Sequence, residues 1–462
     1  LARKLETHLD KDEILTLYLN QIYFGHGRWG IAEAARYYLG KAVPDLSVAD
    51  AALLMALVPA PERLNPFDAL ALSIQRRNSI LERMVTHGFL NQSEAARHQR
   101  IRPQLARRQP PAKVAPWFVD AVKRRLSDAL GSDVVMTGGL RVHTTLDLDA
   151  QASVDAAMKK HLGDAPSAPQ GAVVILDPAS HEVRALSGGT NIAKSSFNRA
   201  IQARRQAGST VKPFVFGAAF ERGVLAPDSE LDNAAVCYRG AKGPWCPRNA
   251  SGEHDGQAVT VAAALTRSLN VIAVQALRHV GIGAFTDFVR RAGVRSPVPS
   301  NLTAALGSGE VTPLEMTNAY ATLASGGHSG DPVLVRRVED VDGRVVYAER
   351  EARRRAIPAA LAQTLTEMLV QVVDEGTGHR AALDGVRVAG KTGTTSGRVD
   401  AWFIGYTVAD SPGQQAAVAG VWMGHDDNTP LVSGSGGSSA APLWADAMRG
   451  WWKTGTQHAV AR

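Results

Sequence analysis

The chain has 462 residues, a length that favours about two or three folded units. Its composition, 45% apolar and 21% charged, excludes a disordered or fibrous protein and indicates a globular one. The net charge of +7 is diffuse, and the modest basic clusters at residues 97–108 and 350–355 lack the interleaved aromatic residues of a single-strand binder. We therefore expect a solvated basic surface and no nucleic acid as partner, with a membrane or an anionic wall polymer as the alternative.

The first 107 residues carry helical periodicity and no obvious catalytic cluster. Their apolar residues recur at helical spacing in three segments, and the third segment ends at Pro59 and Pro61. The carboxylates of this part fall on the polar faces, where solvated side chains are expected. The pattern predicts an all-α unit with helices at residues 5–22, 31–39 and 48–58.

The start of the chain predicts that the sequence is a fragment. Leu1 is neither a methionine nor the beginning of a signal peptide, and it falls inside an apparent helix. No run approaches the 18 apolar residues that a membrane-spanning helix needs. We expect that the true N-terminus, with any membrane anchor, precedes this residue.

The next segment, residues 108–167, is typical of a connector between domains. Several prolines open it, an alternating run at residues 138–146 predicts a strand, and residues 149–162 predict a helix. Its expected function is to connect the two domains and to set the distance between them.

From residue 168 the pattern changes to buried strands. Runs of strands bracket a helix-rich middle part, which predicts an antiparallel sheet with helices packed on it. The strands are expected at residues 171–178, 181–187, 401–406 and 416–423. The serine- and glycine-rich stretch 433–439 is typical of a flexible loop.

The only two cysteines, Cys237 and Cys246, flank a loop that contains glycine and proline. Two cysteines in one loop favour a disulfide in an oxidising compartment. A metal site is the alternative, but it lacks two further ligands nearby, and the thirteen histidines are scattered without metal-ligand spacing. We expect neither a metal nor another cofactor.

A hydroxyl and an amine, those of Ser209 and Lys212, lie three residues apart where a polar segment changes to an apolar run. If that run is a helix, both side chains lie on one face near its N-terminus, where the amine can take the proton of the hydroxyl. Unpaired N–H groups of a first helical turn favour developing negative charge. Alone, the pair favours a helix-capping serine and a solvated lysine, because so short a motif often occurs by chance.

Two further motifs follow in the same half of the chain. Ser268 and Asn270 stand at a corner between two helical segments, which can present a hydroxyl and an amide. Residues 391–395, Lys-Thr-Gly-Thr-Thr, follow a strand-like run, and Gly393 would allow a substrate backbone to come close. Each motif alone has a structural interpretation, a helix cap or a polar edge strand.

Taken together, in this order and spacing, the three motifs resemble those of the serine penicillin-binding and β-lactamase superfamily. The surrounding sequence is similar to the transpeptidase domain of class A penicillin-binding proteins. The similar stretches are Arg205-Gln206-Ala207-Gly208, Trp245 with Pro247-Arg248-Asn249, residues 305–314, Gly376-Thr377-Gly378 and residues 400–406.

The first part of the chain resembles the C-terminal half of the peptidoglycan glycosyltransferase domain of the same bifunctional proteins. The stretches concerned are residues 11–20, 23–25 and 30–41, Ala60-Pro61 and Asn65-Pro66. The catalytic glutamates of that family lie in motifs that would precede this chain, and Arg3-Lys4-Leu5-Glu6 stands too close to residues 11–15 to be one of them. The resemblance implies that this part cannot polymerise glycan strands, whereas the parent protein would.

The resemblance also implies a domain organisation. It comprises an all-α partial glycosyltransferase domain of lysozyme-like fold at residues 1–107, a linker at 108–167, an α+β transpeptidase domain at 168–452 with a central antiparallel sheet, and a tail at 453–462.

The roles implied for the site follow from acyl transfer. Ser209 would attack the carbonyl between two D-alanines, Lys212 would act as base, Ser268 would relay a proton and Asn270 would hold Lys212 and the substrate amide. Which of Lys212, Ser268 and Lys391 accepts the proton of the serine stays open. Lys391 would supply positive charge, Thr392, Gly393, Thr394 and Thr395 would bind substrate, and the N–H groups of Ser209 and Thr394 would form the oxyanion hole.

The implied function is a D,D-transpeptidase that cross-links peptidoglycan stem peptides on the extracytoplasmic side of a cell membrane and is acylated by β-lactams. Its implied partners are stem peptides and glycan strands, lipid II for the parent protein, a membrane reached through a missing anchor, and other cell-wall synthesis proteins. The alternatives are a hydrolase of the carboxypeptidase or β-lactamase type, which shares all three motifs, and a non-catalytic penicillin-binding scaffold. The stem-peptide acceptor and the oligomeric state stay open.

Overall fold

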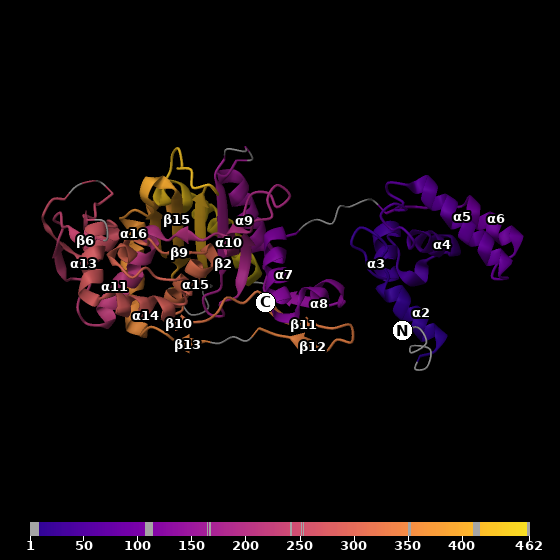
Figure 1. Ribbon diagram of the computed structural model, residues 1–462, viewed down its shortest axis with the longest axis horizontal. Helices are drawn as coiled ribbons and strands as arrows, with labels where there is room; N and C mark the ends of the chain where they lie inside the picture. Colours follow the sequence, from indigo (N-terminus) through magenta and orange to yellow (C-terminus); the bar gives the residue numbers. More distant parts are fainter. Residues whose placement is uncertain are drawn as a thin grey trace. The chain divides into compact units, whose positions relative to one another are not determined.

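Figure 1 presents the computed structural model of the chain, which divides into two compact units between Lys113 and Val114. The structure describes residues 9–106, 114–163, 165, 168–240, 243–250, 252, 254–349, 353–409 and 416–459, with side chains up to residue 451. The predicted helix start at residues 5–8, the Arg3–Glu6 stretch and the side chains of the predicted tail lie outside these residues.

The first unit is helical, as the sequence predicts. Capping boxes at Asp10, Ser47 and Asn91 start three of its helices, where each side chain accepts a hydrogen bond from a backbone N–H of the first turn. A small core that includes the fully buried Phe24 and Tyr38 holds the unit together. The elements are α2 (Lys11–Gln21), α3 (Ile31–Ala34), the π-helical turn η1 (Ala35–Leu39), η2 (Val43–Asp45), α4 (Val48–Leu57), α5 (Leu70–Thr86) and α6 (Gln92–Arg100).

The second unit is organised by a five-stranded antiparallel sheet in the order β14-β15-β16-β2-β3. These strands contain almost only buried residues, which explains the continuous apolar runs in the sequence. The bounds are β2 (Gln170–Leu176), β3 (Val183–Ser187), β14 (Val388–Thr394), β15 (Asp400–Thr407) and β16 (Val418–Gly424). The expected fold class, an all-α part followed by an α+β unit with a central antiparallel sheet, is confirmed.

Helices cover both faces of this sheet, because alternate residues of each strand point to opposite sides. Trp402 and Trp422 face the layer that contains α11 (Lys212–Glu221), α13 (Asn270–Val280) and α15 (Pro313–Ala324). Phe403 and Val421 face the other layer, formed by α9 (Leu148–His161) and α17 (Ala441–Ala459). The other helices of the unit are α7 (Pro116–Leu130), α8 (Ser132–Thr137), α10 (Arg199–Gln202), α12 (Val261–Thr266), α14 (Ile282–Ala292) and α16 (Ala359–Asp374).

Most of the segment predicted to connect the domains is packed into the second unit. Trp117 and Phe118 of α7 belong to the larger core, and α9 lies against β3 and α17. The strand β1 (Arg141–Thr144) pairs with β11 (Val335–Glu339), far along the chain. The amphipathic faces of these elements therefore find their partners within the second unit.

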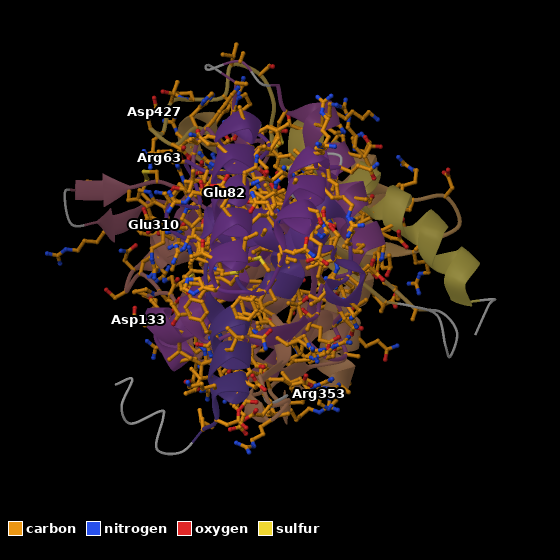
Figure 2. The ribbon with its side chains drawn as sticks, turned by 90° about the vertical axis from the view of Figure 1, so that its right-hand side faces the viewer. Arg63, Glu82, Asp133, Glu310, Arg353 and Asp427 are labelled. Atoms are coloured by element: carbon orange, nitrogen blue, oxygen red, sulfur yellow. A yellow bond between two sulfur atoms is a disulfide. The ribbon has the colours of Figure 1, made fainter. Side chains whose placement is uncertain are left out.

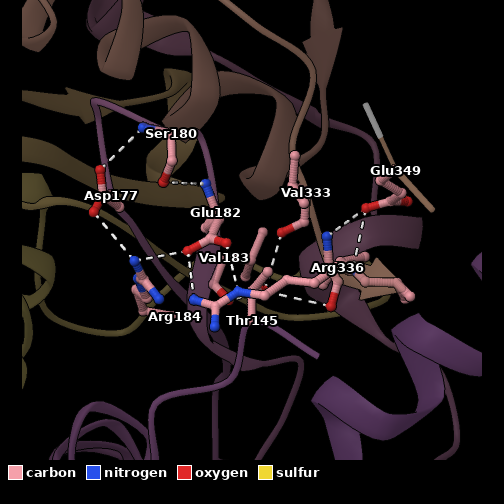
Figure 3. A network of polar contacts seen from close by, with 11 residues as sticks. Thr145, Asp177, Ser180, Glu182, Val183, Arg184, Val333, Arg336 and Glu349 are labelled. Carbon is pink, nitrogen blue, oxygen red and sulfur yellow. Dashed lines mark hydrogen bonds and ion pairs between the residues drawn. The ribbon is translucent and has the colours of Figure 1, made fainter. Parts of the chain in front are cut away.

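A polar network fastens β11 to the edge of the central sheet (Figure 3). The carboxylate of Glu182 accepts hydrogen bonds from Arg336 at 2.7 and 2.9 Å and lies 2.7 Å from a guanidinium nitrogen of Arg184. The hydroxyl of Thr145 donates to the carbonyl of Val183 at 2.7 Å. The edge strand β3 is thus covered and does not present a free row of backbone groups.

Charged side chains lie on the outside of both units. Arg63 and Glu82 of the first unit and Asp133 and Glu310 of the second are exposed, and Figure 2 labels these four residues. Within the described ranges, no helix combines the length and the apolar composition that crossing a bilayer requires.

Candidate active site

The two residues of the first motif lie at the start of α11. Ser209 is in a 3₁₀ turn, η3 (Gly208–Val211), which runs directly into α11 at Lys212. The Ser209 side chain is half-buried and makes no hydrogen bond with any residue that the structure describes. Its hydroxyl is therefore available to a bound molecule, and the site holds Lys212 by other contacts.

Two glycines meet behind the serine turn. The N–H of Gly208 donates to the carbonyl of Gly307 at 3.1 Å, and the N–H of Ala207 donates to the carbonyl of Gly309 at 3.1 Å. Gly307 has a φ of +69°, and a Cβ added to it would lie 2.1 Å from the carbonyl oxygen of Gly208. Only glycine tolerates both conditions, so this contact fixes the backbone that carries the serine.

Two buried side chains anchor the same turn from other sides. The indole N–H of Trp402 donates to the carbonyl of Gln206 at 2.9 Å, and the hydroxyl of Tyr320 donates to the carbonyl of Thr210 at 2.7 Å. Both rings belong to the larger core. The turn is thus held by the sheet and by α15 at once.

The amine of Lys212 is fully buried and points to the corner formed by the second motif. It donates to the carbonyl oxygen of Ser268 at 2.7 Å, to the Ser268 hydroxyl at 3.3 Å and to Oδ1 of Asn270 at 2.7 Å. Burial, followed by the nearby charge of Lys391, lowers the pKa of Lys212 well below its ordinary value. A larger fraction of Lys212 is therefore in the neutral amine form than is the case for an exposed lysine at the same pH.

Ser268 has a left-handed backbone, with a φ of +57°. A non-glycine residue in this region costs about 1–3 kcal/mol when the surrounding structure holds it there, and such residues cluster at functional sites. It lies between α12 and α13, and both its carbonyl and its hydroxyl face the amine of Lys212. The strain accompanies a geometry that offers the lysine two acceptors from one residue.

The third motif lies on β14, the edge strand of the sheet nearest the serine turn. Lys391 is fully buried, and burial lowers its pKa to about 7. A Cβ on Gly393 would lie 2.9 Å from a methyl carbon of Thr210 and 3.0 Å from the carbonyl oxygen of Ala207. This glycine is thus needed for the strand to pack against the serine turn.

The threonine hydroxyls of β14 have partners within the protein. Thr392 Oγ1 lies 2.7 Å from Thr377 Oγ1 and accepts from the amine of Lys391 at 3.3 Å. Thr394 Oγ1 accepts from the N–H of Gly436 at 3.0 Å. That contact comes from the start of an ordered π-helical turn, η7 (Gly436–Ala440), so the prediction of a flexible loop at 433–439 is wrong for these residues.

Thr395, the last predicted substrate-binding residue, bends away from the strand. Its hydroxyl donates to the carboxylate of Asp400 at 3.0 Å and accepts from the N–H of Asp400 at 2.9 Å. The other carboxylate oxygen accepts from the indole N–H of Trp422 at 2.9 Å. Burial raises the pKa of Asp400 in spite of these bonds. The structure therefore gives Thr395 a role in closing the turn after β14.

A cavity of about 480 Å³ adjoins the site without containing Ser209. It begins where β14 ends and is bounded by Gln206, Thr395 and Asp400, together with the exposed Arg204 and Glu310. Its volume is in the range of small-molecule sites. The cavity wall includes Gln206, three residues before Ser209, and Thr395, the residue that follows β14.

Cys237 and Cys246 form a disulfide, so that interpretation of the two cysteines is confirmed. The bond closes a hairpin of two short strands, β6 (Tyr238–Gly240) and β7 (Gly243–Trp245). The chain continues from this hairpin to Arg248 and Asn249, both of which contact Asn270.

The structure thus brings Lys212, Ser268 and Asn270 into direct contact and puts Lys391 beside them. Ser209 precedes Lys212 on the same helical start but is not hydrogen-bonded to it. The pairing of Thr392 with Thr377 and the contacts of Asn249 were not predicted. Thr377 and Asn249 both belong to stretches that carry the family resemblance, but no local sequence pattern indicates which residues they contact.

Comparison with known proteins gives two family matches along the chain. Residues 171–449 match the family described as the penicillin binding protein transpeptidase domain, and residues 1–85 match the family described as transglycosylase. Penicillin-binding protein 1A of Aquifex aeolicus is 31% identical over 97% of this chain and 72% of its own length. Penicillin-binding protein 2D of Bacillus subtilis is 31% identical over 96% of this chain and 65% of its own length.

Solved structures agree in fold. The crystal structure of penicillin-binding protein 1A from Haemophilus influenzae superposes with a TM-score of 0.79 at 22% identity, covering 96% of this chain and 86% of that one. PonA1 of Mycobacterium tuberculosis in complex with penicillin V superposes with a TM-score of 0.65 at 28% identity, covering 73% of this chain and 94% of that one.

Proposed function

Because the chain belongs to the class A penicillin-binding proteins, which carry a transglycosylase and a peptidoglycan transpeptidase domain, we propose that it cross-links stem peptides through an acyl-enzyme on Ser209. One observation carries this proposal. The buried amine of Lys212 lies one helical turn beyond Ser209, and its pKa is lowered by burial and by the charge of Lys391. A lysine in this condition is suited to accept a proton from a hydroxyl.

In the proposed reaction, Ser209 Oγ attacks the carbonyl carbon between two D-alanines, and its proton passes to the neutral amine of Lys212. The bond to the terminal D-alanine breaks, and its nitrogen receives a proton through the hydroxyl of Ser268, which lies 3.3 Å from that amine. An acceptor amine then attacks the ester, which forms the cross-link and returns the proton to Ser209. The Lys212 amine, held by Asn270, is the point through which both proton transfers pass.

The backbone N–H groups of Ser209 and Thr394 are proposed to stabilise the oxyanion, a contribution of about 2.7–4 kcal/mol for each such donor. The close approach of the two segments supports this role, because a Cβ on Gly208 would lie 3.4 Å from the nitrogen of Thr394. A substrate carbonyl oxygen that enters between the two segments could accept hydrogen bonds from both N–H groups.

The hydroxyls of Thr392 and Thr394 are proposed to donate hydrogen bonds to the substrate carboxylate. Thr394 Oγ1 accepts from Gly436 at 3.0 Å, which leaves its own hydrogen free to donate. Lys391, whose pKa is lowered to about 7, gains a proton more readily when an anion binds beside it. The carboxylate would therefore recruit the positive charge that holds it.

The same chemistry predicts covalent inhibition by β-lactams, whose strained amide replaces the D-alanine peptide bond. The relative PonA1, 28% identical, has been solved in complex with penicillin V. The proposed location is extracytoplasmic, which the disulfide between Cys237 and Cys246 favours because such bonds persist in oxidising compartments. For the whole protein we propose glycan strands and lipid II as the substrates of the transglycosylase part.

Labelling with a fluorescent penicillin tests the proposal. We expect wild-type protein to form a covalent adduct that survives denaturation, and Ser209→Ala to form none. Equal labelling of both proteins would mean that another residue is the nucleophile, and absence of labelling in both would favour a non-catalytic scaffold. The lifetime of the adduct separates transpeptidase from hydrolase, because release within seconds is the behaviour of a β-lactamase.

A further inference from the structure

Asn270 is held from outside its own helix by a residue that lies outside the three catalytic motifs. The side-chain oxygen of Asn249 accepts from the N–H of Asn270 at 2.9 Å and from the N–H of Val271 at 3.3 Å. These are the first N–H groups of α13, which have no partner within a helix, and Leu269 at the cap position provides no side-chain bond. Asn249 therefore caps α13 across 21 residues of sequence.

The preceding residue holds the side chain of Asn270. The Nδ2 of Asn270 donates to the carbonyl of Arg248 at 2.6 Å. The Oδ1 of the same amide then faces the amine of Lys212, from which it accepts at 2.7 Å. Arg248 and Asn249 thus fix both the backbone and the side-chain amide of Asn270. The position of the Lys212 amine therefore depends on the position of the Asn270 side-chain amide.

The orientation of the Asn249 amide is itself determined by a chain of polar contacts. Asn249 Nδ2 donates to Oδ1 of Asn233 at 2.7 Å, and Nδ2 of Asn233 donates to the carboxylate of Asp255 at 2.8 Å. A backbone N–H can only donate and a carboxylate can only accept, so both amides between them have one permitted orientation. Asn249 and Asn233 are 5% and 2% exposed, so water has little access to replace these bonds.

From this arrangement we infer that Asn249 is a positioning residue for acylation, which acts through Asn270 on Lys212 and does not touch the substrate. The inference rests on the proposed function of Lys212. Loss of the Asn249 oxygen would leave the start of α13 uncapped and let the Asn270 amide drift. Because small displacements of a catalytic group cost up to about a hundredfold in rate, the effect on acylation should exceed the effect on folding.

The first measurement is the rate of acylation by a fluorescent penicillin, with the full chain and a series of probe concentrations that reaches saturation. We expect Asn249→Ala to lower the limiting rate by about tenfold to a hundredfold, with little change in the concentration that gives half the limiting rate. Asp147→Ala is the matched control, because Asp147 also accepts from two N–H groups at a helix start, but that helix, α9, packs on the opposite face of the sheet. It should acylate at the wild-type rate.

The second measurement exploits the polarity of the contact chain. Asn249→Asp alone would set carboxylates on both sides of Asn233, whose amide oxygen must then face one of them, and acylation should slow. In Asn249→Asp with Asp255→Asn, the Asn233 amide can reverse and pair with both side chains, and only the bond from the N–H of Gln257 to residue 255, 3.2 Å in the wild type, is given up. The double variant should therefore acylate faster than Asn249→Asp. Asp255→Asn alone should remain close to wild type.

Three results would overturn the inference: acylation of Asn249→Ala at the wild-type rate, a loss that equals the unfolded fraction seen by circular dichroism, or a double variant no faster than Asn249→Asp. If wild-type protein itself is not acylated, the proposed function fails first, so the two failures are distinguishable.

Discussion

Lys212 and Lys391 share one buried site, where burial and then the charge of Lys391 lower the pKa of Lys212. Two buried lysines without a described carboxylate partner at their amines can both be protonated only at a large free-energy cost. The two residues are therefore coupled: the charge state of one sets the proton affinity of the other.

The first prediction concerns the pH dependence of acylation. Only the neutral amine of Lys212 can act as base, so the acylation rate should fall as the pH falls through its lowered pKa. Replacing Lys391 with methionine removes the charge that helps to lower this pKa, so the remaining activity should be lost at a higher pH than in wild type. The rate of penicillin acylation measured across the pH range tests this, with Lys123→Met, an exposed lysine, as control. An unchanged profile in Lys391→Met would contradict the coupling.

The second prediction concerns stability. The folded pKa of Lys391 is about 7, below the unfolded value of about 10.4, so the unfolded chain binds more protons between these limits. The free energy of unfolding should therefore rise with pH between about 7 and 10, and the part due to Lys391 should vanish in Lys391→Met. Urea denaturation at two pH values within this window, followed by tryptophan fluorescence, compares the two proteins. A variant with the same pH dependence as wild type would show that burial does not perturb Lys391.

The third prediction concerns the cover of β14. A Cβ on Gly436 would lie 2.4 Å from the carbonyl oxygen of Trp402 and 2.5 Å from that of Gly393, so Gly436→Ala must displace backbone. We expect a loss of about 1–3 kcal/mol in stability. Acylation should also be slower, because the displaced backbone moves the N–H of residue 436 away from the hydroxyl of Thr394. Thermal unfolding and penicillin labelling measure the two effects.

Gly283→Ala is the control for this substitution. No atom lies within 4 Å of the added Cβ, and the residue is exposed in α14, so it should be neutral or stabilising. Equal losses in both variants would contradict the steric explanation.

The fourth prediction concerns the disulfide. Cys237 and Cys246 are 9 residues apart, and a loop of this length gives a chain-entropy contribution of about 2–3 kcal/mol. Reduction should lower the unfolding midpoint and slow acylation several-fold, because Arg248 and Asn249 follow the hairpin closely. Midpoints measured with and without reductant, beside a Cys237→Ala, Cys246→Ala double variant that should not respond to it, provide the test. Equal sensitivity of both proteins would assign the effect to something other than this bond.

The sequence allowed the sheet to be predicted, and it indicated the candidate site residues, of which the structure brings Lys212, Ser268 and Asn270 into contact. Continuous apolar runs such as 171–176 are typical of strands buried on both faces, and three short motifs in fixed order are far more specific than any one of them. Ser209 and Lys212 were expected on one helix; the structure instead has a 3₁₀ turn that becomes helical at Lys212.

What could not be predicted depends on contacts between distant segments. The strand at Arg141–Thr144 was expected in a connector, because nothing in its own sequence indicates that it pairs with Val335–Glu339. Likewise, the partner of the Asn249 amide is a helix start 21 residues away. The composition of residues 433–439 is typical of a flexible loop, yet the N–H of Gly436 has an acceptor on β14, and this tertiary bond overrides the local preference.

Under the proposed function, the contact between Gly307 and Gly208 limits how this chain can evolve under antibiotic pressure. A resistant variant must slow its reaction with the drug while it keeps the serine in place for its natural substrate. Since any side chain at position 307 would overlap the backbone of Gly208, the rear of the turn is closed to gradual change. We expect selected substitutions to arise on the open side instead, around exposed positions such as Ser396, where the rim can be reshaped without moving the nucleophile.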